Sequence, residues 1–496
     1  MTSHRPRIYA LFFLIALSCG RAWSQPPEKP SADLLLLNGH VYTSNPTQPW
    51  VNALAIRGEK ILAVGDEAQL SKLRGPQTVV INLGGRMVLP GIIDSHSHFL
   101  DGSLSLDQFS LDDAYTIPEI QRRVRAFAAA HPDRQWLHGY GWLYDAFKPS
   151  GLPTKQILDG VVSDRPVVVD CYDGHSVWLN SRALALAGID RNTPDIKKGG
   201  VVVGTVVHDP VTGEPTGVLK EEAATLVQRV IPEPSREAKL KAIREGLREA
   251  NRHGVTSVLN ASGSIDEIEL YDTLRRQGDL TVRMTTSLIM EPELSEKTLA
   301  MFEEGRRRFN GEWVRGGVIK AFMDGVIESH TAAMLDPYSD DPKLTGSLNY
   351  LPDQFRRNVV ELDRRHFQVI THAIGTRAVR TALDAYQAAL EANGPRDRRF
   401  RIEHIENINP ADIPRFGSLH VIASMQPYHC FPEPNLINVW ARNIGPARLP
   451  YSFAWHDLVA AGAVLAFGSD WPVVSLDPFI GIQNAVTRQN KGTRTF

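Results

Sequence analysis

The sequence predicts an α/β protein in which a (β/α)8 TIM barrel follows a small β-sandwich. From residue 90 onward, short apolar segments alternate with longer helix-like segments, which is typical of parallel βαβ units. Before that point, apolar runs over residues 33–43, 53–65 and 79–89 are separated by turn residues, as in antiparallel hairpins. The length of 496 residues also exceeds what one small core needs, so one large domain with a satellite is expected.

The β-sandwich is expected over residues 33–88 and the barrel over residues 89–496. Eight apolar segments are candidate barrel strands: 88–98, 254–260, 280–290, 317–323, 367–373, 400–404, 420–426 and 463–469. Helix-like segments separate several of them, at 236–253, 353–365 and 376–392. Eight strands that alternate with helices predict a closed barrel.

The interval from residue 99 to residue 229 breaks this rhythm. It contains a predicted strand over residues 166–170 and a predicted helix over about 177–187. Intervals of this length between barrel strands are usually functional lids or subdomains. The sequence therefore predicts an inserted lid after the first barrel strand.

The first 24 residues have the pattern of a secretory signal peptide. Arg5 and Arg7 precede an apolar run over residues 8–17, and small residues follow at 22–24. The run is too short for an ordinary membrane-spanning helix. Export to the periplasm or the medium is expected; the alternatives are a frayed or misassigned start and, as the lesser one, a lipid anchor at Cys19 in a poorly matching lipoprotein box.

The composition narrows the range of partners. A formal net charge of -2 gives no electrostatic reason to expect nucleic acid or an anionic membrane. A small-molecule substrate is the expected partner, and a homo-oligomer remains open. Cys171 and Cys430 are expected to be free buried thiols, although they could pair in an oxidising compartment.

The strongest chemical signal is the sequence DSHSH at residues 94–98, at the end of an apolar strand. Side chains two residues apart point to the same face of a strand, so His96 and His98 would enter the barrel together. The carboxyl end of barrel strands is where barrel enzymes keep their chemistry. Neutral imidazole is a ligand for zinc and related divalent ions, but a bare H-x-H is weak evidence alone.

Similar residues stand at other predicted strand ends. His372 ends the fifth strand, His404 the sixth and Asp470 the eighth, while Lys320 lies within the fourth. Taken singly, each has a plain structural explanation, such as a loop cap, a helix N-cap or a salt bridge. Agreement among five segments in strand order favours one shared site.

Seven motifs together resemble the amidohydrolase superfamily, specifically the amidohydrolase-3 branch of YtcJ-like and N-substituted formamide deformylase-like proteins. They are PGIIDSHSH at 90–98, DGHSVWLNSRAL at 173–184, PTGVLKEEA at 215–223, VIKAFMDGVIESHTA at 318–332, THAIGTRAV at 371–379, RIEHIEN at 401–407 and FGSDWPV at 467–473. The resemblance runs from about residue 33 to the end. Family members normally return to the sandwich after the eighth strand, and this chain ends at Phe496. We expect either a fragment of a longer protein or a decayed version, and the fragment is the simpler explanation.

The resemblance implies a role for each site residue. The implied metal ligands are His96, His98, Lys320, His372, His404 and Asp470. Lys320 would be carboxylated on Nζ and bridge two divalent ions, with zinc expected. Asp470 would also be the catalytic base, which takes a proton from the attacking water and passes it to the leaving amine.

Two further residues are candidates for substrate contact. His175, in the predicted insert, would touch the substrate or polarise its carbonyl, or else have only a packing role. Trp471 follows Asp470 and is a second candidate. The expected reaction is hydrolysis of an amide-type, non-peptide C–N bond, as in an N-substituted formamide or N-acyl compound. A cyclic-amide or ester hydrolase and a metal-binding fragment without turnover are the alternatives.

Overall fold

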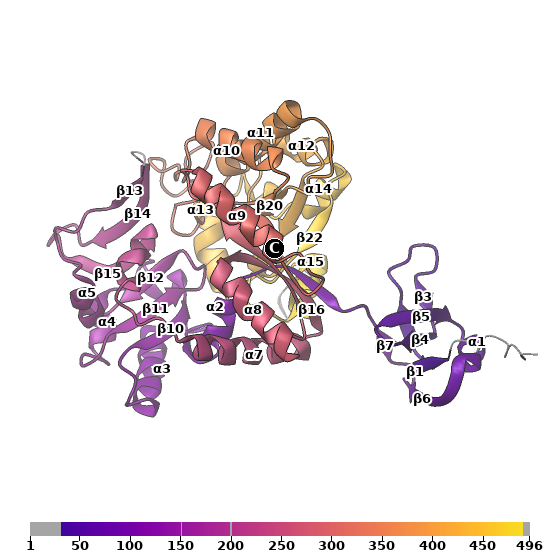
Figure 1. The fold of residues 1–496 in the computed structure, drawn as a ribbon. Helices are drawn as coiled ribbons and strands as arrows, with labels where there is room; N and C mark the ends of the chain where they lie inside the picture. The colour runs from indigo at the N-terminus through magenta and orange to yellow at the C-terminus, as the bar shows by residue number, and fades with distance from the viewer. Residues whose placement is uncertain (1–30, 150, 199–200, 490–496) are drawn as a thin grey trace, which may run out of the picture. The chain divides into compact units, whose positions relative to one another are not determined.

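A computed structural model describes residues 31–149, 151–198 and 201–489 (Figure 1). The predicted signal peptide and Cys19 lie outside the described residues, so both stay predictions. The chain divides into two compact units, Met1–Pro90 and Gly91–Phe496. Within the part of the chain that the structure describes, no helix combines the length and the apolar character needed to cross a membrane.

The first unit contains two small sheets. One has the strand order β5-β4-β1-β6, and the other has the order β3-β2-β7. Leu35 of β1 and Ala53 and Ala55 of β4 are fully buried, because the inward-facing positions of these strands form a small apolar core. The strand bounds are Ala32–Leu37 for β1, His40–Tyr42 for β2, Trp50–Val51 for β3, Ala53–Arg57 for β4, Lys60–Gly65 for β5, Arg74–Asn82 for β6 and Met87–Val88 for β7. The short helix α1 is Glu67–Leu70.

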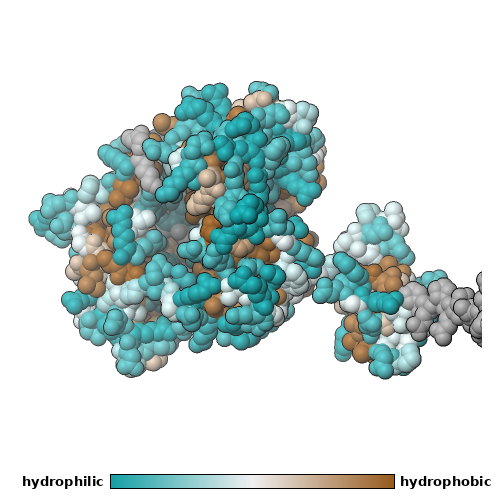
Figure 2. Space-filling model, viewed as in Figure 1, coloured by the Kyte–Doolittle hydropathy of each residue, from teal (hydrophilic) through white to brown (hydrophobic). Residues whose placement is uncertain are grey.

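Several large apolar side chains in the first unit remain exposed, including Ile61 of β5 and Val79 and Ile81 of β6. Figure 2 shows brown, hydrophobic surface on this unit. β6 is an edge strand of its sheet.

The second unit confirms the predicted barrel. Eight parallel strands follow one another in the order β22-β21-β20-β19-β18-β17-β16-β8. Their bounds are Ile92–Ser97 for β8, Val255–Gly263 for β16, Arg283–Ile289 for β17, Val314–Phe322 for β18, Gln368–Ala373 for β19, Arg401–His404 for β20, Ile422–Met425 for β21 and Leu465–Phe467 for β22.

The helices between the barrel strands cover the outside of the sheet (Figure 1). Serine side chains begin three of them: Ser235, Ser264 and Ser295 each accept a hydrogen bond from the backbone N–H three residues further on. The bounds are Arg236–Arg252 for α7, Ile265–Gln277 for α8, Glu296–Arg308 for α9, Pro352–Arg364 for α10, Thr376–Asn393 for α11, Ile413–Ser418 for α12, Ala441–Ile444 for α13, Trp455–Ala460 for α14 and Pro478–Thr487 for α15.

The first and eighth barrel strands meet through the turn that follows β22. The backbone N–H of Asp470 donates to the carbonyl of His96, and the N–H of His98 donates to the carbonyl of Trp471, both at 2.7 Å. The buried Asp94 carboxylate accepts hydrogen bonds from the backbone N–H and the hydroxyl of Ser469. These bonds close the barrel at the end where the predicted site residues lie.

Between β8 and α7 the chain forms the helix α2, Phe99–Ser105, and then a second sheet, ordered β13-β14-β15-β12-β11-β10-β9. Its strands are Phe109–Ser110 (β9), Leu137–Trp142 (β10), Val167–Cys171 (β11), Ser176–Leu179 (β12), Ile196–Lys198 (β13), Val201–His208 (β14) and Pro215–Glu221 (β15). The helices α3, Ile117–Ala130, α4, Lys155–Asp159, α5, Ser181–Ala187, and α6, Thr225–Gln228, accompany this sheet.

The predicted helix over 177–187 was wrong in its first part. Residues Ser176–Leu179 form β12, which lies between β11 and β15. The aromatic and β-branched side chains of this segment fit a buried strand. The helix α5 starts only after Asn180, whose side chain caps it by accepting from the N–H of Ala183.

Candidate metal centre

His96 lies on the first barrel strand, with its Nδ1 held by a partner and its Nε2 without a hydrogen-bond partner. Nδ1 of His96 lies 2.6 Å from Oε2 of Glu403 on β20, and Arg401 holds the same carboxylate. Both His96 and Glu403 are fully buried. Burial alone would raise the pKa of Glu403, but Arg401 and His96 outweigh it and hold that pKa far below its usual range. The ionised carboxylate therefore orients the imidazole so that Nε2 faces the barrel interior.

His98 is held in a similar way by a neutral partner. Its Nδ1 lies 2.7 Å from the hydroxyl of Ser262 on β16. Its Nε2 lies 3.2 Å from Oδ1 of Asp470, and Nε2 of His96 lies 3.4 Å from the same oxygen. As the sequence predicts, the two histidines of the H-x-H motif point the same way. Each directs its Nε2 toward Oδ1 of Asp470.

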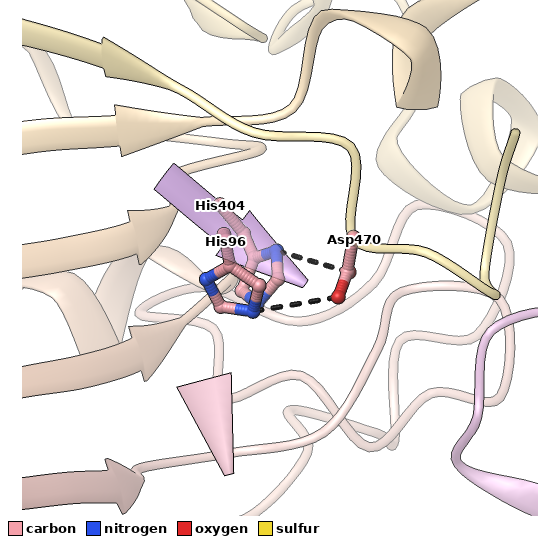
Figure 3. A group of neighbouring side chains, drawn as sticks. All are labelled: His96, His404 and Asp470. Carbon is pink, nitrogen blue, oxygen red and sulfur yellow. Dashed lines mark ion pairs between the residues drawn. The ribbon is translucent and has the colours of Figure 1, made fainter. Parts of the chain in front are cut away.

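Asp470 faces both His96 and His404 (Figure 3). Its Oδ1 faces His96 and His98, while its Oδ2 lies 3.8 Å from Nδ1 of His404. One ligand atom from each of His96, His404 and Asp470 lies within 4.8 Å of the others. Burial would raise the pKa of Asp470, but the neighbouring imidazoles of His96 and His98 prevail and hold it well below its usual range.

His372 extends the group on the side of β19. Its ring centroid lies 4.4 Å from that of His404, and its Nε2 lies 3.2 Å from the carbonyl oxygen of Gly325. Burial and neighbouring positive charges hold the pKa of His372 and of His404 well below the usual value. Both imidazoles are thus neutral at pH 7, which is the form that binds a metal ion.

Lys320 points into the same interior from β18. The residue is fully buried, and its Nζ has no hydrogen-bond partner. Nζ lies 4.4 Å from the centroid of the Phe322 ring. Burial lowers the pKa of this amine to about 8, against the opposing charges of Glu403 and Asp470.

The buried polar atoms of the cluster that have no hydrogen-bond partner show whether a metal ion fits. A buried polar atom without a partner is costly, so such atoms usually have a ligand or ion. Here several face the same space: Nε2 of His96, Nδ1 of His404, Oδ1 of Asp470 and Nζ of Lys320. Imidazole nitrogens together with a carboxylate are a donor set typical of zinc and related divalent ions. The residues present therefore fit a divalent metal ion.

His175 reaches this group from the inserted sheet. It follows β11, and its ring centroid lies 5.0 Å from that of His372. Its Nδ1 lies 2.8 Å from Oε2 of Glu221 at the end of β15. Burial would lower the pKa of His175, but the Glu221 carboxylate outweighs it and raises the pKa to about 9. The insert thus carries a cationic imidazole to the histidine cluster.

The structure does not bring the Trp471 indole into this cluster. The ring packs edge-to-face on Phe99 at 5.5 Å and lies directly over Gly102 of α2. Its contact with substrate stays a prediction. His330 pairs with Asp340. Asp324 lies 3.7 Å from Nε2 of His372 and accepts the backbone N–H groups of Ala333, Ile374 and Gly375.

Sequence reasoning missed three residues that border the site: Glu403, Glu406 and His429. Glu403 stands next to His404 in RIEHIEN, where its alternation with Arg401 could have indicated an inward position. Gln426 and His429 follow the seventh strand. Among the fourth to eighth strands, the seventh alone had supplied no predicted site residue. A polar residue at that strand end was the available signal.

Two of the cluster residues have unusual backbone conformations. His404 has a φ of 74° and Asp470 a φ of 63°, in the left-handed region that glycine prefers. His404 is the last residue of β20, and Asp470 lies shortly after the end of β22. Such strain often occurs at functional sites.

Two cavities lie near this unit's surface, outside the cluster itself. One, of about 400 Å³, lies between the inserted strand β14 and the carboxyl ends of β17 and β18, and its lining includes Glu291, Glu293 and Asn349. The other, of about 540 Å³, lies within the insert and its lining includes Asp195, His208 and Lys220. The first is at the same end of the barrel as the histidines.

The barrel and its histidine-carboxylate cluster define a class of protein, the metal-dependent hydrolases that keep their site at the carboxyl ends of barrel strands. A crystal structure of an uncharacterized metal-dependent hydrolase from Pyrococcus horikoshii OT3 is similar over 92% of this chain and 86% of that one, with a TM-score of 0.69 and 26% sequence identity. The family model of the amidohydrolase family matches residues 79–495. The chain belongs to the amidohydrolase family.

Curated relatives are similar over most of this chain. Protein LONG AFTER FAR-RED 3 of Arabidopsis thaliana is 33% identical, over 93% of this chain and 79% of its own length. The putative amidohydrolase YtcJ of Bacillus subtilis is 29% identical, over 91% and 83%. The N-substituted formamide deformylase of Arthrobacter pascens is 24% identical, over 92% and 84%. These relatives confirm the branch that the sequence motifs indicated.

Proposed function

We propose that this hydrolase cleaves an amide-type, non-peptide C–N bond of a small molecule, such as an N-substituted formamide or an N-acyl compound. The observation that carries the proposal is the place of Asp470, whose carboxylate faces ring nitrogens of both His96 and His404 that have no hydrogen-bond partner. A carboxylate beside metal ligands can act as a general base. The relative from Arthrobacter pascens, by its name, deformylates N-substituted formamides, which supports the bond type.

Divalent metal ions, with zinc as the expected ion, would be held by His96, His98, Lys320, His372, His404 and Asp470. We propose two ions, because six donor groups exceed the four that one zinc ion usually takes. When bound, they lower the pKa of a water molecule and polarise a substrate carbonyl.

The residues of the chain would then move the proton and orient the substrate. Asp470 takes a proton from the attacking water and delivers it to the leaving nitrogen, which departs as a neutral amine. The amine leaves with that proton while the acyl carbon gains the hydroxyl, so atoms and charge balance. His175, held by Glu221, would donate a hydrogen bond to the substrate carbonyl.

Lys320 is proposed to be carboxylated on Nζ. An ammonium group beside two cations would be repelled by them, whereas a carbamate supplies anionic oxygens. The fully buried Nζ without a hydrogen-bond partner supports this assignment.

The proposal is tested by metal analysis combined with a substrate panel. Protein purified without chelator is assayed on N-substituted formamides, N-acyl amines, cyclic amides and carboxylic esters, before and after metal removal. We expect metal-dependent turnover of the open-chain amides and formamides above the other classes. If only cyclic amides or only esters are turned over, the proposed bond type is wrong. The substrate class is then the one that is turned over, and the same residues would act on it.

A further inference from the structure

A chain of polar contacts runs from Trp440, in the segment between β21 and α13, to Asp470 through residues outside the predicted site. Nε1 of Trp440 donates a 2.7 Å hydrogen bond to Oε2 of Glu406. Oε1 of Glu406 lies 3.5 Å from Nδ1 of His429, and Nε2 of His429 lies 3.5 Å from Oδ2 of Asp470. His429 comes from the turn after β21, so the seventh strand reaches the site through it.

The ring of His429 is held in one orientation. Each of its nitrogens faces a carboxylate, Glu406 on one side and Asp470 on the other. Its face lies parallel to the His404 ring, with an interplanar angle of 7° at a centroid distance of 5.9 Å. Glu406 is itself fixed, because Trp440 is almost fully buried and donates to the other carboxylate oxygen. Rotating the imidazole would therefore break contacts on both sides.

Asp470 needs such a constraint for the role proposed above. Its Oδ1 faces His96 and His98, whereas its Oδ2 faces only His404 and His429 among the ion pairs of the described residues. If His404 binds a metal ion, its Nδ1 is occupied. His429 is then the contact that remains to fix Oδ2. At 3.5 Å, Nε2 of His429 faces Oδ2 without forming a hydrogen bond, and catalytic contacts of this kind are often long without substrate and shorten during the reaction.

We propose that His429 is a positioning residue that holds Oδ2 of Asp470, with Glu406 and Trp440 fixing its ring from behind. The inference rests on the proposed role of Asp470 as the base. It concerns the direction of the carboxylate and does not require His429 to exchange a proton.

The test compares His429→Leu, which removes both nitrogens, with His429→Gln, whose amide can still hydrogen-bond to Oδ2. His420→Leu is the matched control, because His420 is exposed and precedes the same strand at its opposite end. We expect His429→Leu to lower kcat by about 10- to 100-fold, the effect of losing a hydrogen bond to a charged group, with little change in KM. His429→Gln should recover most of that loss, and His420→Leu should match the wild type.

Two measurements separate positioning from other roles. Elemental analysis should find equal metal content in all variants, and crystal structures should show the Asp470 carboxylate rotated in His429→Leu but not in His429→Gln. In an Asp470→Asn background, His429→Leu should cause no further fall in kcat, because residues that act as a unit are not additive.

Several results would overturn the inference. Loss of metal in His429→Leu would make His429 a ligand, and equal inactivity of the Gln and Leu variants would make its protonation essential. If His429→Leu fails to fold, Trp440→Phe removes only the Nε1 donor, and an unchanged kcat together with an unmoved His429 ring in that variant contradicts the chain of contacts. If His429→Leu is fully active while Asp470→Asn is inactive, the positioning role of His429 is refuted and the proposed function is not. Full activity of Asp470→Asn would refute the proposed function.

Discussion

The backbone N–H of Asp470 donates a 2.7 Å hydrogen bond to the carbonyl oxygen of His96. Through this bond the main chain fixes the distance between a residue after the eighth strand and a residue of the first. The side chains of the same two residues face each other, with Nε2 of His96 3.4 Å from Oδ1 of Asp470. Closure of the barrel and assembly of the candidate metal centre are therefore one structural event.

Gly468 tests this connection. A Cβ atom added to Gly468 would lie 2.4 Å from the backbone nitrogen of His96, so Gly468→Ala must push the two strands apart. We expect a loss of stability of about 1–3 kcal/mol, typical of overpacking, together with a lower metal content. Urea unfolding and elemental analysis measure the two effects. Gly481→Ala is the control, because its Cβ would have no neighbour within 4 Å; equal metal content in both variants would contradict the coupling.

Metal removal should abolish turnover. We expect purified protein to contain about two divalent ions per chain and to lose activity on dialysis against a chelator. Added zinc should restore it. Elemental analysis of the same samples checks the stoichiometry, and metal-free protein with full activity would refute the metal centre.

Asp470→Asn preserves the shape of the side chain and removes its charge. We expect the variant to keep its metal and to lose about 10²–10⁴-fold in turnover, which is the usual contribution of a positioned general base. Steady-state kinetics and metal analysis on the same preparation are the measurement. If turnover stays at the wild-type rate, the base lies elsewhere, and His175 is the next residue to replace.

Lys320→Ala should lose metal and activity together. If the lysine is a carbamate, a short carboxylic acid such as acetate or propionate can enter the space and restore part of both. The rescue is followed as turnover and metal content against acid concentration. A crystal structure of the metal-loaded wild type gives the direct answer, since electron density that ends at Nζ would exclude the carbamate.

Asp363 is expected to matter for stability and not for chemistry. Its carboxylate is fully buried at the end of α10 and forms ion pairs with Arg396 and Arg398. Asp363→Ala leaves those arginines without their partner, so the free energy of unfolding should fall by about 3–5 kcal/mol. Asp353→Ala is the control at the exposed start of the same helix, where its pair with Arg356 should contribute less than about 1 kcal/mol. Urea unfolding compares them; similar losses would contradict this ranking.

The barrel could be predicted from the sequence because its strands are buried on both faces. Such strands appear as apolar runs with polar residues only at their ends. That pattern also exposed the site, since His372 and Asp470 interrupt the apolar runs where the carboxyl ends begin. The rule failed at residues 177–179, because a four-residue buried strand followed by a helix has the same apolar character as a longer helix.

The contacts of His429 and Trp471 could not be predicted in the same way. His429 lies in a four-residue 3-10 helix, Pro427–Cys430, which is too short for a periodicity to indicate a direction. Its neighbours Glu406 and Asp470 come from the ends of two other strands, so their meeting depends on closure of the whole barrel. The direction of the Trp471 ring depends on Gly102, which leaves the space that the indole fills.

The left-handed backbone at His404 and Asp470 has a consequence for how this protein can change. Glycine adopts such a conformation without the penalty that other residues carry, about 1–2 kcal/mol. Glycine at either position would therefore relieve strain while removing a side chain from the metal centre. A bound metal ion stabilises the native state, so this gain belongs to the metal-free protein; a screen for thermal resistance of metal-free protein would favour such replacements, and laboratory evolution of a sturdier protein has to select for turnover in every round.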